Sequence, residues 1–129
     1  MKVTPLSLDT ARRLAVRGQL LDSQSKLSKG KHGVAQTIAQ LGYVQIDTIA
    51  VIQRTHHHTL WTRLPDYHPN MLDSLQAKER KVFEYWGHAL AYLPMPDYRY
   101  FLPRIANFQN SQSRWITQMR EKAAPVMQP

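Results

Sequence analysis

The segment KHGVAQTIAQLGYVQID, residues 31–47, decides the fold because its hydrophobic period changes from helix to strand. Its first part predicts a helix over 31–41, since one apolar face repeats at i, i+4 and i+7: Val34, Ile38 and Leu41. Gly42 follows at the position where a helix commonly ends in a left-handed residue. Beyond this glycine the period is two, which predicts a short strand over 43–47 with alternate side chains on opposite faces.

Helices and one hairpin surround this segment. A first helix is predicted to begin at Ser7, an N-cap residue, and to run to about Gly18 or Leu21. Small, polar and basic residues then predict a loop over 22–30. After the strand, the sequence predicts helices over 57–64 and 71–78, followed by a hairpin of strands over 81–86 and 90–93. Two more helices are predicted over about 97–108 and about 111–122. Residues 49–54 are apolar and β-branched, and they fit either a strand or a helix.

This order of elements predicts a mainly α fold with short β-hairpins (α+β). It is the order of a winged helix-turn-helix module followed by the start of a second one. We expect the first module over 1–80 and the start of the second over 81–122. Residues 123–129 contain two prolines, which predicts a linker or a truncated end. A fold of this class hosts many activities and does not by itself indicate one.

The composition is that of a basic globular chain. Of its 129 residues 43% are hydrophobic, which is enough for a core. Seventeen Lys and Arg against nine Asp and Glu give a net charge of +8, which indicates a polyanionic partner, nucleic acid before an anionic membrane. No run approaches the roughly 18 apolar residues of a spanning helix, and the N-terminus lacks the apolar region of a secretory signal. Charge alone does not choose between these two partners. We expect a nucleic-acid partner and no membrane, and the lack of cysteines is compatible with the cytoplasmic location that we expect.

Several chemistries are excluded by what the sequence lacks. Zero cysteines exclude disulfides, thiolate zinc sites, iron–sulfur clusters and cysteine nucleophiles. There is no glycine-rich phosphate loop, no G-x-S-x-G and no His-Glu-x-x-His, so nucleotide hydrolases and metalloproteases of those types are excluded. Three adjacent histidines, 56–58, have no Asp, Glu or Cys at ligand spacing, and we expect no metal and no cofactor. Contacts with phosphates or base edges beside Arg54 and Arg63 are a more plausible role for these histidines than metal binding. For at least one of them, a partly buried, hydrogen-bonded ring is more plausible still.

Gln45 and Asp47 are the first candidates for chemistry. At i and i+2 of the predicted strand they point the same way, about 6.6 Å apart along the strand axis. An amide and a carboxylate this close can hold one water between them, and the carboxylate can face a developing cation. The spacing alone favours a plainer interpretation, the solvent face of an amphipathic strand.

Residues 83–88, FEYWGH, combine aromatic side chains that can stack on an unpaired base. Strand alternation predicts that Phe83 and Tyr85 face one way and Glu84 and Trp86 the other, so at least one pair belongs to the core. A structural role is therefore favoured for this segment.

Three motifs follow one another along the chain: LGYVQIDT at 41–48, RTHH with LWTRL at 54–57 and 60–64, and FEYWGH at 83–88. Together they resemble the YcaQ/AlkZ family of bacterial DNA glycosylases, over about residues 6–105. The Gln-apolar-Asp sequence at 45–47 resembles the YcaQ branch, because the AlkZ branch carries Gln-apolar-Gln.

The resemblance implies tandem winged-helix modules with a concave, basic surface for double-stranded DNA, in proteins much longer than this chain. It implies hydrolysis of the N-glycosidic bond of alkylated purines, notably N7-alkylguanine, and unhooking of interstrand crosslinks. Gln45 and Asp47 match the family's catalytic pair. Six further residues are expected to contact DNA: Lys29, Lys31, Arg54, His56, His57 and Arg63. Because the chain matches an N-terminal portion, we expect it to be a weak enzyme, or inactive, by itself.

Two other functions stay open on the sequence. A non-catalytic winged-helix module, such as a transcriptional regulator, would bind DNA by phosphate and groove contacts and would not depend on Asp47. An interaction domain that binds no nucleic acid would leave the net charge of +8 without a role.

Overall fold

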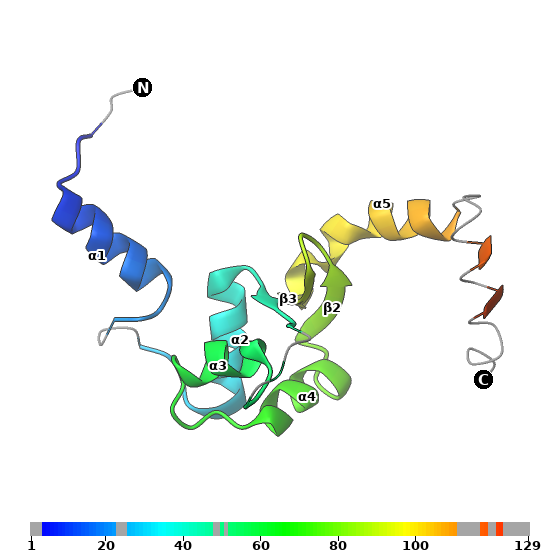
Figure 1. The fold of residues 1–129 in the computed structure, drawn as a ribbon, viewed down its shortest axis with the longest axis horizontal. Helices are drawn as coiled ribbons and strands as arrows, with labels where there is room; N and C mark the ends of the chain where they lie inside the picture. The colour runs from blue at the N-terminus through cyan, green and yellow to red at the C-terminus, as the bar shows by residue number, and fades with distance from the viewer. Residues whose placement is uncertain are drawn as a thin grey trace. The chain divides into compact units, whose positions relative to one another are not determined.

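The computed structural model describes residues 4–22, 26–47, 50, 52–110, 117–118 and 121–122. This part of the chain has an α+β fold, mainly helical with one small antiparallel sheet, as the sequence predicts. The elements along the chain are α1 Leu8–Gly18, α2 Gly30–Leu41, β1 Val44–Gln45, α3 Thr55–Trp61, α4 Pro69–Ala77, β2 Val82–Trp86, β3 Leu90–Pro94, the 3-10 turn η1 Met95–Asp97 and α5 Tyr98–Gln109 (Figure 1).

The change of period after α2 is confirmed. Gly42 adopts φ 82°, and its N–H donates to the carbonyl of Ile38, which ends the helix. A left-handed residue here costs little because glycine has no Cβ. The chain turns at once into β1, and the N–H of Ile46 donates to the carbonyl of Leu90 at 2.8 Å, one residue beyond the strand. The strand is therefore shorter than the predicted 43–47.

The sheet has the strand order β1-β3-β2, with both pairs antiparallel. The elements α2, β1, α3, α4 and the β2–β3 hairpin follow one another in the order of a winged helix-turn-helix module. The contacts within the chain divide it into two units, 1–96 and 97–129, so the hairpin shares a unit and a sheet with β1. The division into modules at residue 80 stays a prediction.

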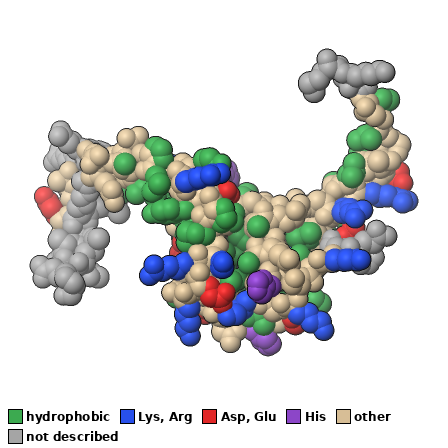
Figure 2. Space-filling view, turned by 180° about the vertical axis from the view of Figure 1, so that it is seen from behind, with side chains coloured by type: hydrophobic (Ala, Val, Ile, Leu, Met, Phe, Trp, Pro, Cys, Tyr) green, Lys and Arg blue, Asp and Glu red, His purple; other side chains and the backbone are tan. Residues whose placement is uncertain are grey.

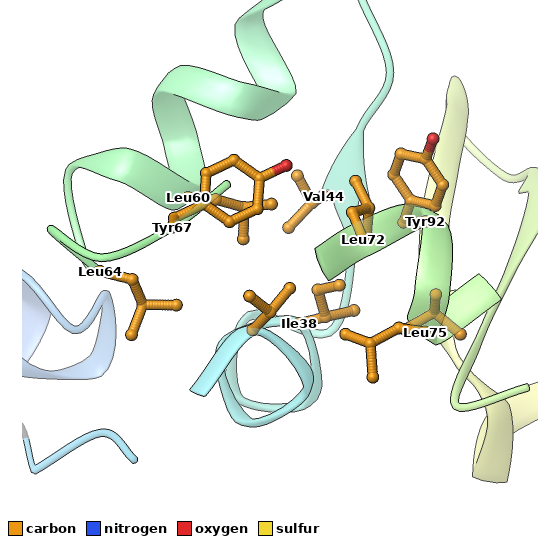
Figure 3. Close-up of a cluster of buried hydrophobic side chains, with 10 residues drawn as sticks. Ile38, Val44, Leu60, Leu64, Tyr67, Leu72, Leu75 and Tyr92 are labelled. Atoms are coloured by element: carbon orange, nitrogen blue, oxygen red, sulfur yellow. The ribbon is translucent and has the colours of Figure 1, made fainter. Parts of the chain in front are cut away.

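The core of the first unit lies where three helices meet the sheet, and Figure 3 shows most of its members. Each element from α2 to β3 contributes at least one buried side chain: Val34, Ile38, Val44, Leu60, Leu64, Tyr67, Leu72, Leu75, Val82 and Tyr92. The hydroxyls of Tyr67 and Tyr92 lie on the side of this core away from Ile38 and Leu75 (Figure 3). The side of the core that faces away from Ile38 and Leu75 therefore carries two phenolic hydroxyls.

Helix α1 begins as predicted but buries none of its residues. Ser7 is the N-cap, and its hydroxyl accepts from the N–H of Thr10 at 3.1 Å. The apolar residues Leu8 and Leu14 are both exposed. Helix α5, in the second unit, likewise has no buried residue and contains Pro103.

Two expected helices have other bounds in the structure: α4 is Pro69–Ala77 where the sequence predicts 71–78, and α3 differs at both ends. Helix α3 begins at Thr55 and ends at Trp61, whereas the sequence predicts 57–64. Residues 62–64 form turns instead, in which the N–H groups of Arg63 and Leu64 both donate to the carbonyl of Leu60. Most of the predicted helix 111–122, part of segment 49–54 and all of 123–129 lie outside the described residues. No described helix has the length and apolar character that crossing a membrane requires.

Gly33 tests the packing of α2. A Cβ at this buried position would lie 2.0 Å from the carbonyl oxygen of Ser28 and 2.7 Å from Cδ2 of Leu64. We expect Gly33→Ala to lower the free energy of unfolding by about 1 to 3 kcal/mol, the usual effect of overpacking, in urea unfolding. Gly18→Ala is the matched control, because nothing lies within 4 Å of its Cβ. Equal stability of the two variants would show that the approach of Ser28 is not tight.

Candidate functional site

Gln45 and Asp47 lie on and just beyond the edge strand of the sheet. Val44 pairs with Tyr92 and is 2% exposed, and Ile46 packs against the core. Gln45 pairs with Ala91, and its side chain is exposed. The strand thus presents its apolar side chains to the core and its amide to solvent, as the alternation predicts.

Asp47 is half-buried and is held by the start of α3. Its Oδ2 accepts a hydrogen bond from the hydroxyl of Thr55 at 3.3 Å. This contact fixes a carboxylate at the edge of the sheet without burying it. A carboxylate in this position can accept a proton from water or oppose a positive charge. Thr55 could not have been assigned this positioning role from the sequence, because it is eight residues away.

His56 is buried inside the module. It is 3% exposed, and among the described residues its Nδ1 has no hydrogen-bond partner. Its ring meets that of Tyr92 edge to face, with centroids 5.6 Å apart. Burial, with the nearby His57 and Arg54, lowers the pKa of His56 to about 4 against the partial opposition of Glu84. The ring is therefore neutral at pH 7.

His57 is tied to a core tyrosine. Its Nδ1 lies 2.8 Å from the hydroxyl of Tyr67, and its ring packs near that of Trp61. Burial lowers the pKa of His57, although Asp73 opposes this. Burial also raises the pKa of Tyr67, so the pair is neutral and acts as a hydrogen-bonded part of the core. This agrees with the prediction of a partly buried, hydrogen-bonded histidine.

A second tyrosine, Tyr92, carries its hydroxyl on the same side of the core as Tyr67 (Figure 3). Burial and the carboxylate of Glu84 raise the pKa of Tyr92 to about 12. Glu84 in turn accepts from Nε2 of Gln76 at 2.8 Å, which joins α4 to β2. The carboxylates of Asp73 and Glu84 thus act on the titratable groups at this end of the core, and the guanidinium of Arg54 opposes them.

Arg63 makes its hydrogen bonds within the protein. Its Nε donates to the carbonyl of Gln19 at 2.8 Å, and its Nη1 donates to the carbonyl of Thr59 at 2.8 Å. Arg54 and Lys29 are exposed and stand at the N-caps of α3 and α2. The structure therefore leaves Arg54 and Lys29 more accessible than Arg63, and the DNA-contact roles of all three stay predictions.

The sequence LysGluArgLys at 78–81 forms a basic turn that we define as Lys78, Arg80 and Lys81. All three side chains are exposed, between α4 and β2. Glu79 is paired with Lys31, whose Nζ also contacts Ser74, and this pairing lowers the pKa of Glu79. The one acid of the turn is thus neutralised by a cation from α2. This run of basic residues can be recognised in the sequence, but it lies outside the three motifs on which the family resemblance rests.

Lys and Arg side chains are spread over the visible face of the packed module among hydrophobic and acidic ones (Figure 2). Among the described residues, no group of three or more His, Asp or Glu could hold a metal ion. Gln45 and Asp47 supply an amide and a carboxylate to the sheet edge.

The lowered pKa of His56 predicts how stability depends on pH. Between pH 6.5 and about 4 the unfolded chain binds a proton at this histidine that the folded chain does not. Stability is therefore complete above pH 6.5 and falls as the pH is lowered, by about 2 kcal/mol between pH 7 and 5. Urea unfolding at both pH values should show this loss, and His56→Gln should reduce it. His58→Gln, in the exposed neighbour, is the control and should retain the wild-type dependence. An unchanged dependence in His56→Gln would show that another group causes it.

Comparison with known proteins places this arrangement in a family. Residues 38–128, more than two thirds of the chain, match the family described as DNA glycosylase AlkZ-like. The match includes β1, the histidines and the hairpin. No solved structure matches the chain. The sheet edge that carries Gln45 and Asp47 thus lies within the matched region, and the chain belongs to the AlkZ-like family of DNA glycosylases.

Proposed function

We propose that this chain belongs to the YcaQ branch and hydrolyses the N-glycosidic bond of N7-alkylated purines in double-stranded DNA, including crosslinked ones. Membership of the family implies hydrolase activity on N-glycosyl bonds. One observation supports the catalytic assignment. Gln45 and Asp47 lie at an open sheet edge, whereas Val44 and Ile46, which alternate with them along the strand, pack in the core. Neither polar side chain is needed to build that core.

The chemistry of the substrate fits a carboxylate and an amide. Alkylation at N7 makes the purine a cation, so it leaves as a neutral base when the bond from N9 to C1′ breaks. The remaining sugar resembles an oxocarbenium ion, which an ionised Asp47 stabilises electrostatically. Water then attacks C1′, and its proton passes to the Asp47 carboxylate. Gln45 can orient that water, because its amide both donates and accepts hydrogen bonds.

The open edge also suits a bulky lesion. Many enzymes that act on a base must rotate it into a tight pocket, which a crosslinked base resists. Gln45 is exposed and Asp47 is half-exposed at the rim of the sheet. A duplex can therefore bring the damaged nucleotide to these groups with less distortion.

The alternative of a sequence-reading regulator is less well supported. In a helix-turn-helix module the second helix reads the major groove, which corresponds to α4 in the order of elements. That helix, PNMLDSLQA, contains no Lys or Arg and exposes Asp73. A helix without Lys or Arg lacks the side chains that usually contact phosphates and the edges of guanine bases.

The basic turn is the more suitable phosphate contact. It adjoins Lys31 near the start of α2, whereas β1 follows the end of that helix. The twelve residues of α2 span about 18 Å, which is about five base-pair steps of a duplex. One bound duplex can thus reach both the basic turn and the sheet edge.

Asp47→Asn should remove most of the base release and leave duplex affinity near the wild-type value. The substitution keeps the shape and a hydrogen-bond acceptor for Thr55 but deletes the charge that opposes the sugar cation. Loss of such a group typically lowers the rate on the order of 10² to 10³. Gln45→Ala should have a similar or smaller effect, since the charge remains.

The measurement is single-turnover release of 7-methylguanine with the chain in excess, so that a slow catalyst is still detected, beside a binding titration. Asp66→Asn is the matched control, because Asp66 is exposed and accepts one hydrogen bond, from the N–H of Gly30 at 2.8 Å. If Asp47→Asn releases the base at the wild-type rate, Asp47 is not a catalytic residue.

The basic turn predicts the salt dependence of binding. Replacing Lys78, Arg80 and Lys81 together by Gln should weaken binding to any duplex. It should reduce the slope of log affinity against log salt by about 0.9 for each phosphate that the turn no longer neutralises. The matched variant replaces Arg12, Arg13 and Arg17 of α1 by Gln and removes the same charge. An equal reduction in both variants would assign the effect to net charge and contradict a role for the basic turn.

A further inference from the structure

Tyr85 carries a polar group on the face of the sheet that also carries Gln45. Paired residues of an antiparallel sheet place their side chains on the same face, and Gln45 pairs with Ala91, which pairs with Tyr85. These three residues therefore form one row across β1, β3 and β2. The other face belongs to the core, where Val44 and Tyr92 are paired and buried. The amide and the phenol thus stand on one side of the sheet.

This face is apolar at one end and polar at the other. Phe83 pairs with Leu93, and both side chains are buried. In the next row on this face Ala91 is buried, whereas Tyr85 is half-buried and Gln45 is exposed. Among the paired residues that the structure describes on this face, only Gln45 and Tyr85 carry a polar side-chain atom. The row that Tyr85 shares with Gln45 relates it to the candidate site.

The row places Tyr85 within reach of the DNA backbone near a nucleotide bound at Gln45. Paired Cα atoms in an antiparallel sheet lie about 5 Å apart, so two strand spacings separate the Cα atoms of Gln45 and Tyr85 by about 10 Å. Successive base pairs of a duplex rise about 3.4 Å, so this distance spans about three nucleotides. A duplex that presents a lesion to Gln45 and Asp47 can therefore bring the phosphate of a nearby nucleotide to Tyr85. That contact requires no rotation of the base.

The hydrogen-bond donor at this position is a neutral one. The β2–β3 hairpin, residues 82–94, contains no Lys or Arg. A cationic side chain in place of Tyr85 would weaken the effect of the Asp47 carboxylate on the sugar and would oppose the positive charge that forms there. A tyrosine hydroxyl donates a hydrogen bond to a phosphate oxygen without adding charge. Such a donor therefore suits a phosphate close to the lesion, whereas the basic turn suits phosphates farther along the duplex.

We propose that the hydroxyl of Tyr85 donates a hydrogen bond to one phosphate within about three nucleotides of the lesion, and so sets the position of the damaged nucleotide at Gln45 and Asp47. The inference rests on the proposed function and adds a substrate-binding residue to it. Tyr85 contacts the backbone of an intact duplex, so a crosslinked base stays in the stack. The basic turn supplies affinity through charge, whereas Tyr85 supplies the register of the duplex on the sheet edge.

Binding to duplexes with one neutral phosphate tests this contact. Each duplex carries 2′-fluoro-7-methylguanosine, which resists hydrolysis, and one methylphosphonate at a different position near this lesion. We expect Tyr85→Phe to lower affinity for the duplex without methylphosphonate about tenfold, the usual effect of losing a hydrogen bond to a charged group. At one position the methylphosphonate should weaken binding of the wild-type chain but should weaken binding of Tyr85→Phe no further. The slope of log affinity against log salt should not change, because a neutral donor releases no counterions.

Tyr100→Phe is the matched control. Tyr100 is 66% exposed and lies in α5, in the second unit, where Arg99 donates to its hydroxyl at 2.7 Å. This variant should keep the wild-type affinity and the wild-type response to each methylphosphonate. If Tyr85→Phe binds like the wild-type chain, or if its effect and that of the methylphosphonate add at every position, the inference is wrong. Either result leaves the catalytic assignment intact, because Asp47→Asn tests that assignment separately, through base release.

Discussion

The pairing of β1 with β3 is the constraint on which the candidate site depends. Two residue pairs and one further hydrogen bond, from Ile46 to Leu90, hold this edge strand. Because side chains alternate along a strand, a slip of one residue would turn Gln45 into the core and expose Val44. The buried Val44 therefore fixes the orientation of the amide. The same register places Tyr85 of the hairpin in one row with Gln45.

Neutral polar groups support this edge from inside. His56 and Tyr92 pack edge to face behind β1, and His57 is hydrogen-bonded to Tyr67. Burial lowers the pKa of both histidines and so favours their uncharged forms at neutral pH. The rings that face the sheet from the core are thus neutral rather than imidazolium cations.

The sequence predicted α2, its end at Gly42 and the hairpin well, because their periodicity and turn residues agree with their packing. The direction of Gln45 was also predictable, since alternation requires only that Val44 be buried. Long-range contacts were not predictable: Thr55 holds Asp47, and Arg63 bonds to Gln19 across 44 residues. Helix α1 differs in another way, because its apolar residues Leu8 and Leu14 are exposed. Periodicity indicates that a helix can pack on one face, but it does not indicate that a partner is present, and α1 buries nothing.

The proposed function requires one small module to bind a polyanion and to act on a cation. A uniform excess of +8 would surround a catalytic carboxylate with Lys and Arg, which would pair with it and weaken its effect on the sugar. Instead, residues 82–97 and α4 lack Lys and Arg, and the basic turn lies near the opposite end of α2. Arg54, the residue before Thr55, is a cation at the end that carries Asp47. Screening at physiological salt acts over about 8 Å, and α2 spans about 18 Å. The basic turn is therefore largely screened from Asp47, so the proposed contacts of both with one duplex weaken each other little.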